Sequence, residues 1–110
     1  MSGDRVLLQD IMTSIDNVEK YSRHGQTEFV ANELVQTWIA HQLQIIGEAA
    51  SRTSETLRAN HREIPWKQII ALRQILLHDS FGVNPANVWH TVENELPSLK
   101  KRIEAVLRTT

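Results

Sequence analysis

The sequence contains no cysteine, and only four glycines and three prolines occur among its 110 residues. Without cysteine the chain cannot form a disulfide, a thiolate zinc site, an iron–sulfur cluster or a thiol nucleophile. The scarcity of glycine and proline excludes a collagen-like or low-complexity chain. Hydrophobic residues make up 41% of the chain and charged residues 23%. This composition predicts a folded protein, and the length predicts one domain over residues 1–110.

The sequence also lacks an excess of charge of one sign and a long hydrophobic run. Its formal net charge is -1, which excludes a generally basic coat and restricts any nucleic-acid contact to a local patch. No apolar run approaches the roughly 20 residues of a membrane span. The first five residues lack the apolar core of a signal peptide. We therefore expect a cytoplasmic protein with no membrane contact.

No stretch alternates between apolar and polar residues as a strand would, whereas apolar residues recur at helical spacing along nearly the whole chain. The pattern predicts an all-α bundle of four to five helices. The predicted helices cover residues 4 to about 21, about 28 to 50, 65 to about 81, and 85 almost to the C-terminus, with a possible short helix at 55–60. Gly82 is expected to stop the third long helix, and Pro97 to form a kink or a tight junction in the last.

Arg73 interrupts an otherwise apolar helix face. On a helical wheel it falls near the middle of the stripe that contains Ile69 and Leu72. A charge on a core-facing stripe is costly unless it is paired or exposed in a cleft. Arg73 could therefore bridge to a carboxylate on another helix, such as Glu48, or it could belong to an active site.

His78 follows Arg73 by five residues, which places it about 140° around an ideal helix. The two side chains can converge only if the helix end distorts before Gly82, or if a second subunit closes the site. The spacing alone is weak evidence, because eight arginines and five histidines occur in the chain.

Several longer segments carry a resemblance to a known family. The stretch Arg73-Gln-Ile-Leu-Leu-His78-Asp-Ser-Phe-Gly82-Val resembles the signature of the HepT-like toxins, a branch of the HEPN superfamily. The segments Leu43-Gln-Ile-Ile-Gly-Glu48-Ala-Ala and Glu63-Ile-Pro-Trp66-Lys-Gln-Ile-Ile70 agree in order and spacing, as does the ending from Val88 to Leu99. The resemblance covers about residues 5 to 108.

The resemblance implies a helical HEPN-type bundle that forms a homodimer and cleaves RNA through an R-x(4–6)-H motif without a metal or another cofactor. It further implies a toxin whose antitoxin is a minimal (MNT-type) nucleotidyltransferase. Carried onto this chain, Arg73 and His78 are the catalytic residues, with Gln74 and Asp79 in support. Gln74 stands where the family often has asparagine.

Ser80 occupies the position at which the family usually has a tyrosine that accepts AMP from the antitoxin. A serine hydroxyl is shorter than a phenol and far less acidic. We therefore expect poor modification at Ser80 and neutralisation mainly by a stable complex with the antitoxin. The rival interpretation is a catalytically silent subunit that docks a nucleotidyltransferase.

The remaining candidates are weaker. His41 and Glu48 lie on one helix row, which predicts a core histidine paired with a carboxylate or, alternatively, a residue beside the active cleft. The three tryptophans, at 38, 66 and 89, are expected in core or dimer packing, with base stacking as the alternative. We expect His24, His61 and His90 at the surface. The basic last turns, with Lys100, Lys101, Arg102 and Arg108, form a solvated face or an RNA-backbone patch.

Overall fold

The computed structural model describes residues 2–77 and 85–109, and these residues contain helices and no strands. The predicted all-α class is confirmed for this part of the chain. The predicted number of helices was too low, because the described residues form seven. They are α1 (Ser2–Ser22), α2 (Gly25–Ala31), α3 (Glu33–Ser51), α4 (Glu55–Asn60), α5 (Trp66–Leu77), α6 (Pro85–Asn94) and α7 (Leu96–Thr109).

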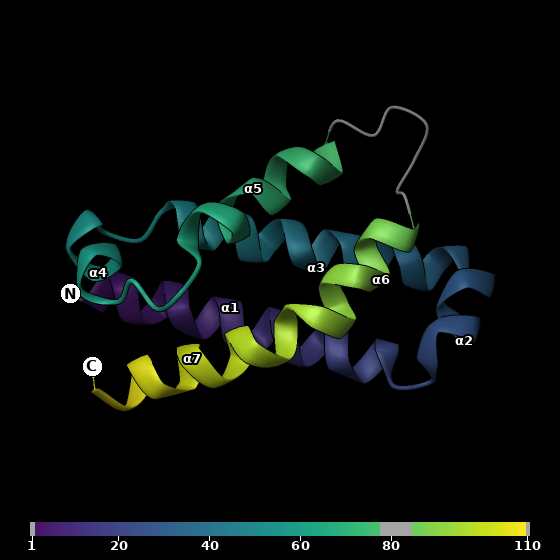
Figure 1. Ribbon diagram of the computed structural model, residues 1–110, viewed down its shortest axis with the longest axis horizontal. Helices are drawn as coiled ribbons and strands as arrows, with labels where there is room; N and C mark the ends of the chain where they lie inside the picture. The colour runs from purple at the N-terminus through teal and green to yellow at the C-terminus, as the bar shows by residue number, and fades with distance from the viewer. Residues whose placement is uncertain (1, 78–84, 110) are drawn as a thin grey trace.

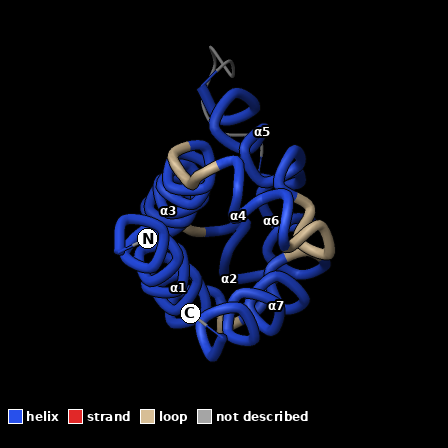
Figure 2. Tube along the Cα trace, turned by 90° about the vertical axis from the view of Figure 1, so that its left-hand side faces the viewer, coloured by secondary structure: helices blue, strands red, loops and turns tan. Residues whose placement is uncertain are grey.

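Two long antiparallel helices, α1 and α3, lie side by side and form the centre of the molecule (Figure 1). Helix α7 packs along α1, and α5 packs chiefly on α3. Viewed along the long axis, α1, α3, α6 and α7 surround the interior, whereas α5 lies at the outer edge (Figure 2). Helix α5 therefore depends on α3 for most of its tertiary contacts.

The interior is built from one apolar stripe of each long helix. The stripe of α1 is Leu8, Ile11, Ile15 and Val18, which recur at helical spacing and are all fully buried. From α3, Ile39, Ile46 and Ala50 are fully buried. The neighbouring row of α3 is buried only in part, because Ala49 is buried whereas Leu34 and Trp38 are exposed.

Asn32 divides the predicted helix 28–50 into two. Its backbone is extended, with φ -119° and ψ 100°, and its side chain accepts a hydrogen bond of 3.1 Å from the Val35 amide. This N-cap starts α3 and lets α2 turn back toward the core. Phe29 of α2 is buried there, with its ring centroid 5.2 Å from that of Trp89. Gly25 begins α2 at a positive φ of 89° that favours glycine.

The region around Pro97 forms the tight junction that the sequence allowed. Helix α6 ends at Asn94 and α7 begins at Leu96. The Glu95 amide still donates to the Thr91 carbonyl at 3.0 Å, and the Glu95 carbonyl accepts from the Leu99 amide at 3.1 Å. Pro97 lies in the first turn of α7, where a missing N–H costs little.

Gly82, the predicted stop signal of the helix that begins at residue 65, lies outside the described residues. Within the described ranges, no helix combines the length and the apolar character needed to cross a lipid bilayer.

Candidate active site

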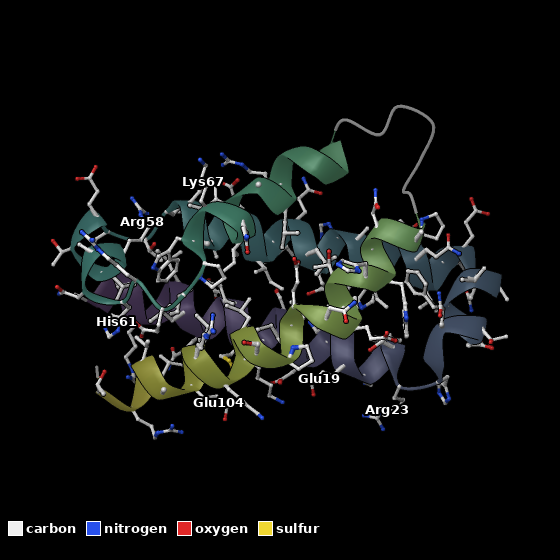
Figure 3. All side chains as sticks on the ribbon, in the orientation of Figure 1. Glu19, Arg23, Arg58, His61, Lys67 and Glu104 are labelled. Carbon is white, nitrogen blue, oxygen red and sulfur yellow. The ribbon has the colours of Figure 1, made fainter. Side chains whose placement is uncertain are left out.

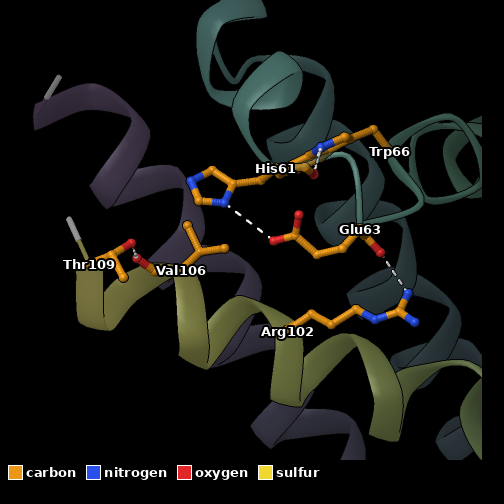
Figure 4. Close-up of polar contacts among 6 residues, drawn as sticks. All are labelled: His61, Glu63, Trp66, Arg102, Val106 and Thr109. Atoms are coloured by element: carbon orange, nitrogen blue, oxygen red, sulfur yellow. Dashed lines mark hydrogen bonds and ion pairs between the residues drawn. The ribbon is translucent and has the colours of Figure 1, made fainter.

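The start of α5 is held by contacts between the preceding loop and α7 (Figure 4). The Trp66 indole N–H donates to the His61 carbonyl at 2.9 Å, and the Arg102 guanidinium donates to the Glu63 carbonyl at 2.7 Å. The Glu63 carboxylate lies 3.3 Å from His61 Nδ1. These bonds satisfy loop carbonyls and fix the position from which α5 begins.

Glycine at position 47 allows α3 and α5 to approach closely. A Cβ atom at Gly47 would lie 3.0 Å from both the Arg73 amide nitrogen and the Ile69 carbonyl oxygen. The absence of a side chain therefore lets the backbone of α5 lie directly on α3. This contact places Arg73 opposite the last turn of α3.

Arg73 is paired with two side chains of that last turn. Its Nη1 lies 2.9 Å from the Glu48 carboxylate and 3.2 Å from Ser51 Oγ. Ser51 Oγ in turn donates to the Glu48 carbonyl at 2.7 Å. The predicted bridge between Arg73 and Glu48 is confirmed. The side chain of Arg73 is nevertheless 35% exposed, so the guanidinium is accessible to solvent while its orientation is held by its partners.

A groove between α1 and α3 opens beside this cluster. Its volume is about 630 Å³, and Arg73 closes it on the side of α5. Polar side chains line most of its length: Asp10, Thr13, Ser14, Asn17, His41, Gln42, Gln44, Glu48, Arg52 and Arg73. The groove therefore offers hydrogen-bond donors and acceptors along its length, with two guanidinium groups at one end.

The buried amide of Gln42 and the buried hydroxyl of Ser14 belong to this groove, and neither was singled out from the sequence. Gln42 Oε1 accepts a 3.2 Å hydrogen bond from Asn17 Nδ2 across the α1–α3 seam. The available signal was a pair of polar residues at the edges of apolar stripes. Such a signal does not tell a groove from an ordinary solvent boundary.

His78, Asp79 and Ser80 lie outside the described residues, and nothing is described of the Gln74 side chain. Whether His78 approaches Arg73 therefore stays a prediction.

The prediction of a core histidine at position 41 was wrong. His41 is exposed and lines the groove that also contains Glu48, in keeping with the alternative position beside the cleft. His24 and His90 are exposed as expected, and His61 is partly exposed. Among the described residues, no three histidine, aspartate or glutamate side chains converge as a metal site would require.

The basic residues of α7 divide between surface and structural roles. Lys101 and Arg108 are exposed, as a solvated face requires. Lys100 lies 2.9 Å from the Glu19 carboxylate and 3.6 Å from that of Asp16, and the hydrogen bond to Glu19 raises the pKa of Lys100. Glu19 points from α1 toward α7 in Figure 3. Lys100 thus joins α1 to α7 at the surface.

Residues 11–106 match the family described as Ribonuclease HepT-like, and the chain belongs to this family. The helical fold of the described residues agrees with that assignment.

Curated relatives cover nearly the whole chain. A protein of Thermococcus cleftensis named "Probable ribonuclease HepT" is 35% identical over 98 residues, which is 88% of this chain and 89% of the relative. Two others, from Caldanaerobacter subterraneus and Methanocaldococcus jannaschii, both named "Putative RNase", are 32% and 31% identical; the alignments cover 98% and 93% of this chain and 97% and 94% of the relatives. No solved structure matches the chain closely enough to extend this comparison.

Proposed function

We propose that the protein is a metal-independent endoribonuclease in which Arg73 and His78 are the catalytic residues. The observation that carries the proposal is that Arg73 is both held in a fixed orientation and accessible to solvent. Glu48 and Ser51 orient its guanidinium, and the side chain remains accessible at the edge of a polar groove. An arginine held in this way can bind a phosphate with fixed geometry and stays charged at any working pH.

The reaction would use the 2′-hydroxyl of the RNA as nucleophile. A base removes its proton, the oxygen attacks the adjacent phosphorus, and the bond from phosphorus to the 5′-oxygen breaks as an acid protonates that oxygen. The products are a 2′,3′-cyclic phosphate and a 5′-hydroxyl. His78 supplies proton transfer because the unperturbed pKa of histidine lies near 6.5. Arg73 stabilises the charge on the phosphorane oxygens.

We propose further that the active form is a homodimer. On an ideal helix Arg73 and His78 point about 140° apart, so that one helix does not bring both to one phosphate. A two-fold dimer would set two Arg–His pairs around one cleft. One His78 could then act as the base and its mate as the acid.

In the cell this activity would make the protein the toxin of a toxin–antitoxin pair, with a minimal nucleotidyltransferase as the antitoxin. Membership of the HepT-like family supports this role. Ser80 lacks the phenol that would favour nucleotidyl transfer. Neutralisation would therefore rest on a stable complex between the two proteins.

The test is cleavage of RNA by the purified chain, free of any partner and in the presence of EDTA. His78→Ala and Arg73→Ala should each reduce the rate by roughly 10²- to 10⁴-fold. Mass spectrometry of the products should show a 2′,3′-cyclic phosphate. Lys67→Ala, at an exposed position on α5, is the matched control and should cleave at the parent rate.

If folded His78→Ala cleaves as fast as the parent, the assignment of His78 is wrong. If the parent does not cleave RNA but binds a nucleotidyltransferase encoded beside it, the protein is a silent docking subunit.

A further inference from the structure

The three tryptophans have different environments, although the sequence places all of them on helical stripes. Trp66 and Trp89 are at least 91% buried, and their indole N–H groups donate to the His61 carbonyl and to the Glu93 carboxylate. Trp38 is 42% exposed on the outer side of α3. An exposed indole forfeits much of the burial energy that a core tryptophan provides, and exposed aromatic groups often mark binding surfaces.

Trp38 belongs to a cluster of three ring side chains, which we term the aromatic platform: Tyr21 of α1, and Trp38 and His41 of α3. The rings of Tyr21 and Trp38 meet edge to face, with centroids 6.1 Å apart and an interplanar angle of 75°. The centroids of Trp38 and His41 are 6.2 Å apart. All three residues are exposed, so the cluster presents ring surface to solvent while its members hold one another in place.

The aromatic platform lies at the opposite end of the groove from Arg73. His41 lines the groove itself, and Tyr21 follows Asn17, another lining residue, by one helical turn. Trp38 precedes Glu48, the partner of Arg73, by ten residues, which corresponds to about 15 Å along a helix. The amides of Asn17 and Gln42 lie between the two ends.

The charges of the groove suit a nucleic acid strand. Arg73 and Arg52 line one end, and at the other end Lys20 Nζ lies 5.6 Å from the ring centroid of Tyr21. Two carboxylates, those of Asp10 and Glu48, also line the groove, and Glu48 is engaged by Arg73. Cations near the two ends can contact separate phosphates of one strand, and the amide groups between them match the edges of unpaired bases.

We infer that the aromatic platform binds unpaired bases of the RNA substrate by stacking, while the adjoining backbone lies against Arg73. This inference rests on the proposed ribonuclease function and adds to it the requirement for a single-stranded segment. Tyr21 and Trp38 act as substrate-positioning residues. The inferred occupant of the groove is single-stranded RNA.

The experiment measures RNA binding in a His78→Ala background, which prevents cleavage. The probes are a fluorescein-labelled single-stranded RNA and a strand of the same length with abasic sites in place of the bases. Trp38→Leu retains an apolar side chain but removes the ring, and Trp38→Phe restores a ring. Leu34→Ala is the matched control, because Leu34 is 83% exposed on the same side of α3 and has no ring.

Trp38→Leu should weaken binding of the RNA by roughly 5- to 150-fold, the range for one stacked base. The His78→Ala background should bind the abasic strand with the same affinity whether or not it also carries Trp38→Leu. Trp38→Phe should recover most of the affinity, and Leu34→Ala should not change it. RNA should quench the tryptophan fluorescence of the background protein, and the quenching should disappear in Trp38→Leu because Trp66 and Trp89 are buried.

Unchanged RNA affinity in Trp38→Leu would overturn the inference. So would conversion of a dimer to a monomer by both Trp38→Leu and Leu34→Ala in sedimentation, because the surface would then be a protein interface. The two proposals fail separately. If the parent cleaves RNA and Trp38→Leu leaves the KM unchanged, the proposed ribonuclease function stands and the inference about the aromatic platform fails. If the parent binds RNA through Trp38 but does not cleave it, the inference about the aromatic platform stands and the proposed ribonuclease function fails.

Discussion

At the residue scale, the position of Arg73 depends on the small size of Gly47. A single Cβ atom at position 47 would contact the backbone of α5 at 3.0 Å, at the residue that carries the guanidinium. The contact atoms are backbone, so they cannot move aside as the end of a flexible side chain could. Because α5 packs chiefly on α3, the displacement would be taken up by movement of α5. Such a movement changes the distance from Arg73 to Glu48.

Gly47→Ala should therefore affect activity more than stability. Replacing glycine in a helix interior gains about 1 kcal/mol of helix propensity, which offsets part of the roughly 1–3 kcal/mol cost of overpacking. We expect the free energy of unfolding in urea to fall by no more than about 2 kcal/mol. RNA cleavage should fall by about tenfold or more, because small misplacements of a catalytic group are costly.

Gly3→Ala provides the matched control for this substitution. Gly3 also lies in a helix, but a Cβ atom there would meet nothing within 4 Å. It should leave cleavage unchanged and stability equal or slightly higher. Parent-level cleavage by Gly47→Ala would contradict the proposed dependence of Arg73 on this contact.

At the scale of elements, the start of α1 is joined to the start of α4 by one carboxylate. Asp4 Oδ1 accepts from the Ser54 amide at 2.8 Å, and Asp4 Oδ2 accepts from the Ser54 hydroxyl at 2.6 Å. The same hydroxyl accepts from the Leu57 amide at 3.0 Å and so caps α4. Asp4 therefore orders both the N-terminal turn of α1 and the connection that leads to α5.

Asp4 should make the stability of the protein depend on pH in the acidic range. The hydrogen bond from the Ser54 hydroxyl lowers the pKa of Asp4 in the folded chain. Its contribution is therefore complete above the unfolded pKa of about 3.9 and is lost as the pH falls through the lower folded value. Asp4→Asn should cost about 1–2 kcal/mol of unfolding free energy near pH 6, and the difference from the parent should vanish in strong acid.

Urea unfolding at a series of pH values measures this effect. Asp10→Asn is the control, because Asp10 is an exposed carboxylate on the same helix. It should leave the parent's pH dependence nearly intact. A constant difference between the parent and Asp4→Asn from neutral pH down to pH values well below the ordinary aspartate pKa would show that the ionised form is not the one stabilised.

At the scale of the whole molecule, the proposed homodimer places two copies of the chain around one cleft. Sedimentation at micromolar concentration should give twice the chain mass of 12.6 kDa. Adding excess His78→Ala subunits to the parent should lower the activity per parent subunit, because a mixed dimer contains a single His78. A monomer, or unchanged activity per parent subunit, would contradict the dimeric scheme. Excess Arg5→Ala subunits, which retain His78, are the matched control. Adding them should not lower the activity per parent subunit.

Much of the helical structure could be predicted from local sequence. The stripe of α1, the bounds of α4 and the junction at Pro97 follow from apolar spacing and from the fixed φ of proline. The division at Asn32 could not be predicted with the same ease. An asparagine caps a helix only where the chain turns, and here the turn accompanies the burial of Phe29 against Trp89.

The sequence by itself determined the helical class, the apolar stripe of each long helix and the motifs shared with the HepT-like family, because these depend on spacing along the chain. Only the tertiary structure decided which row of α3 faces the core, and hence that Trp38 and His41 lie at the surface. It likewise decided that Arg73 meets Glu48 and Ser51 at the end of a polar groove. The physical reason is that apolar residues lie on more than one side of α3, so their spacing allows several rotations of the helix about its axis. The packing of α1 and α5 against α3 selects one of these rotations.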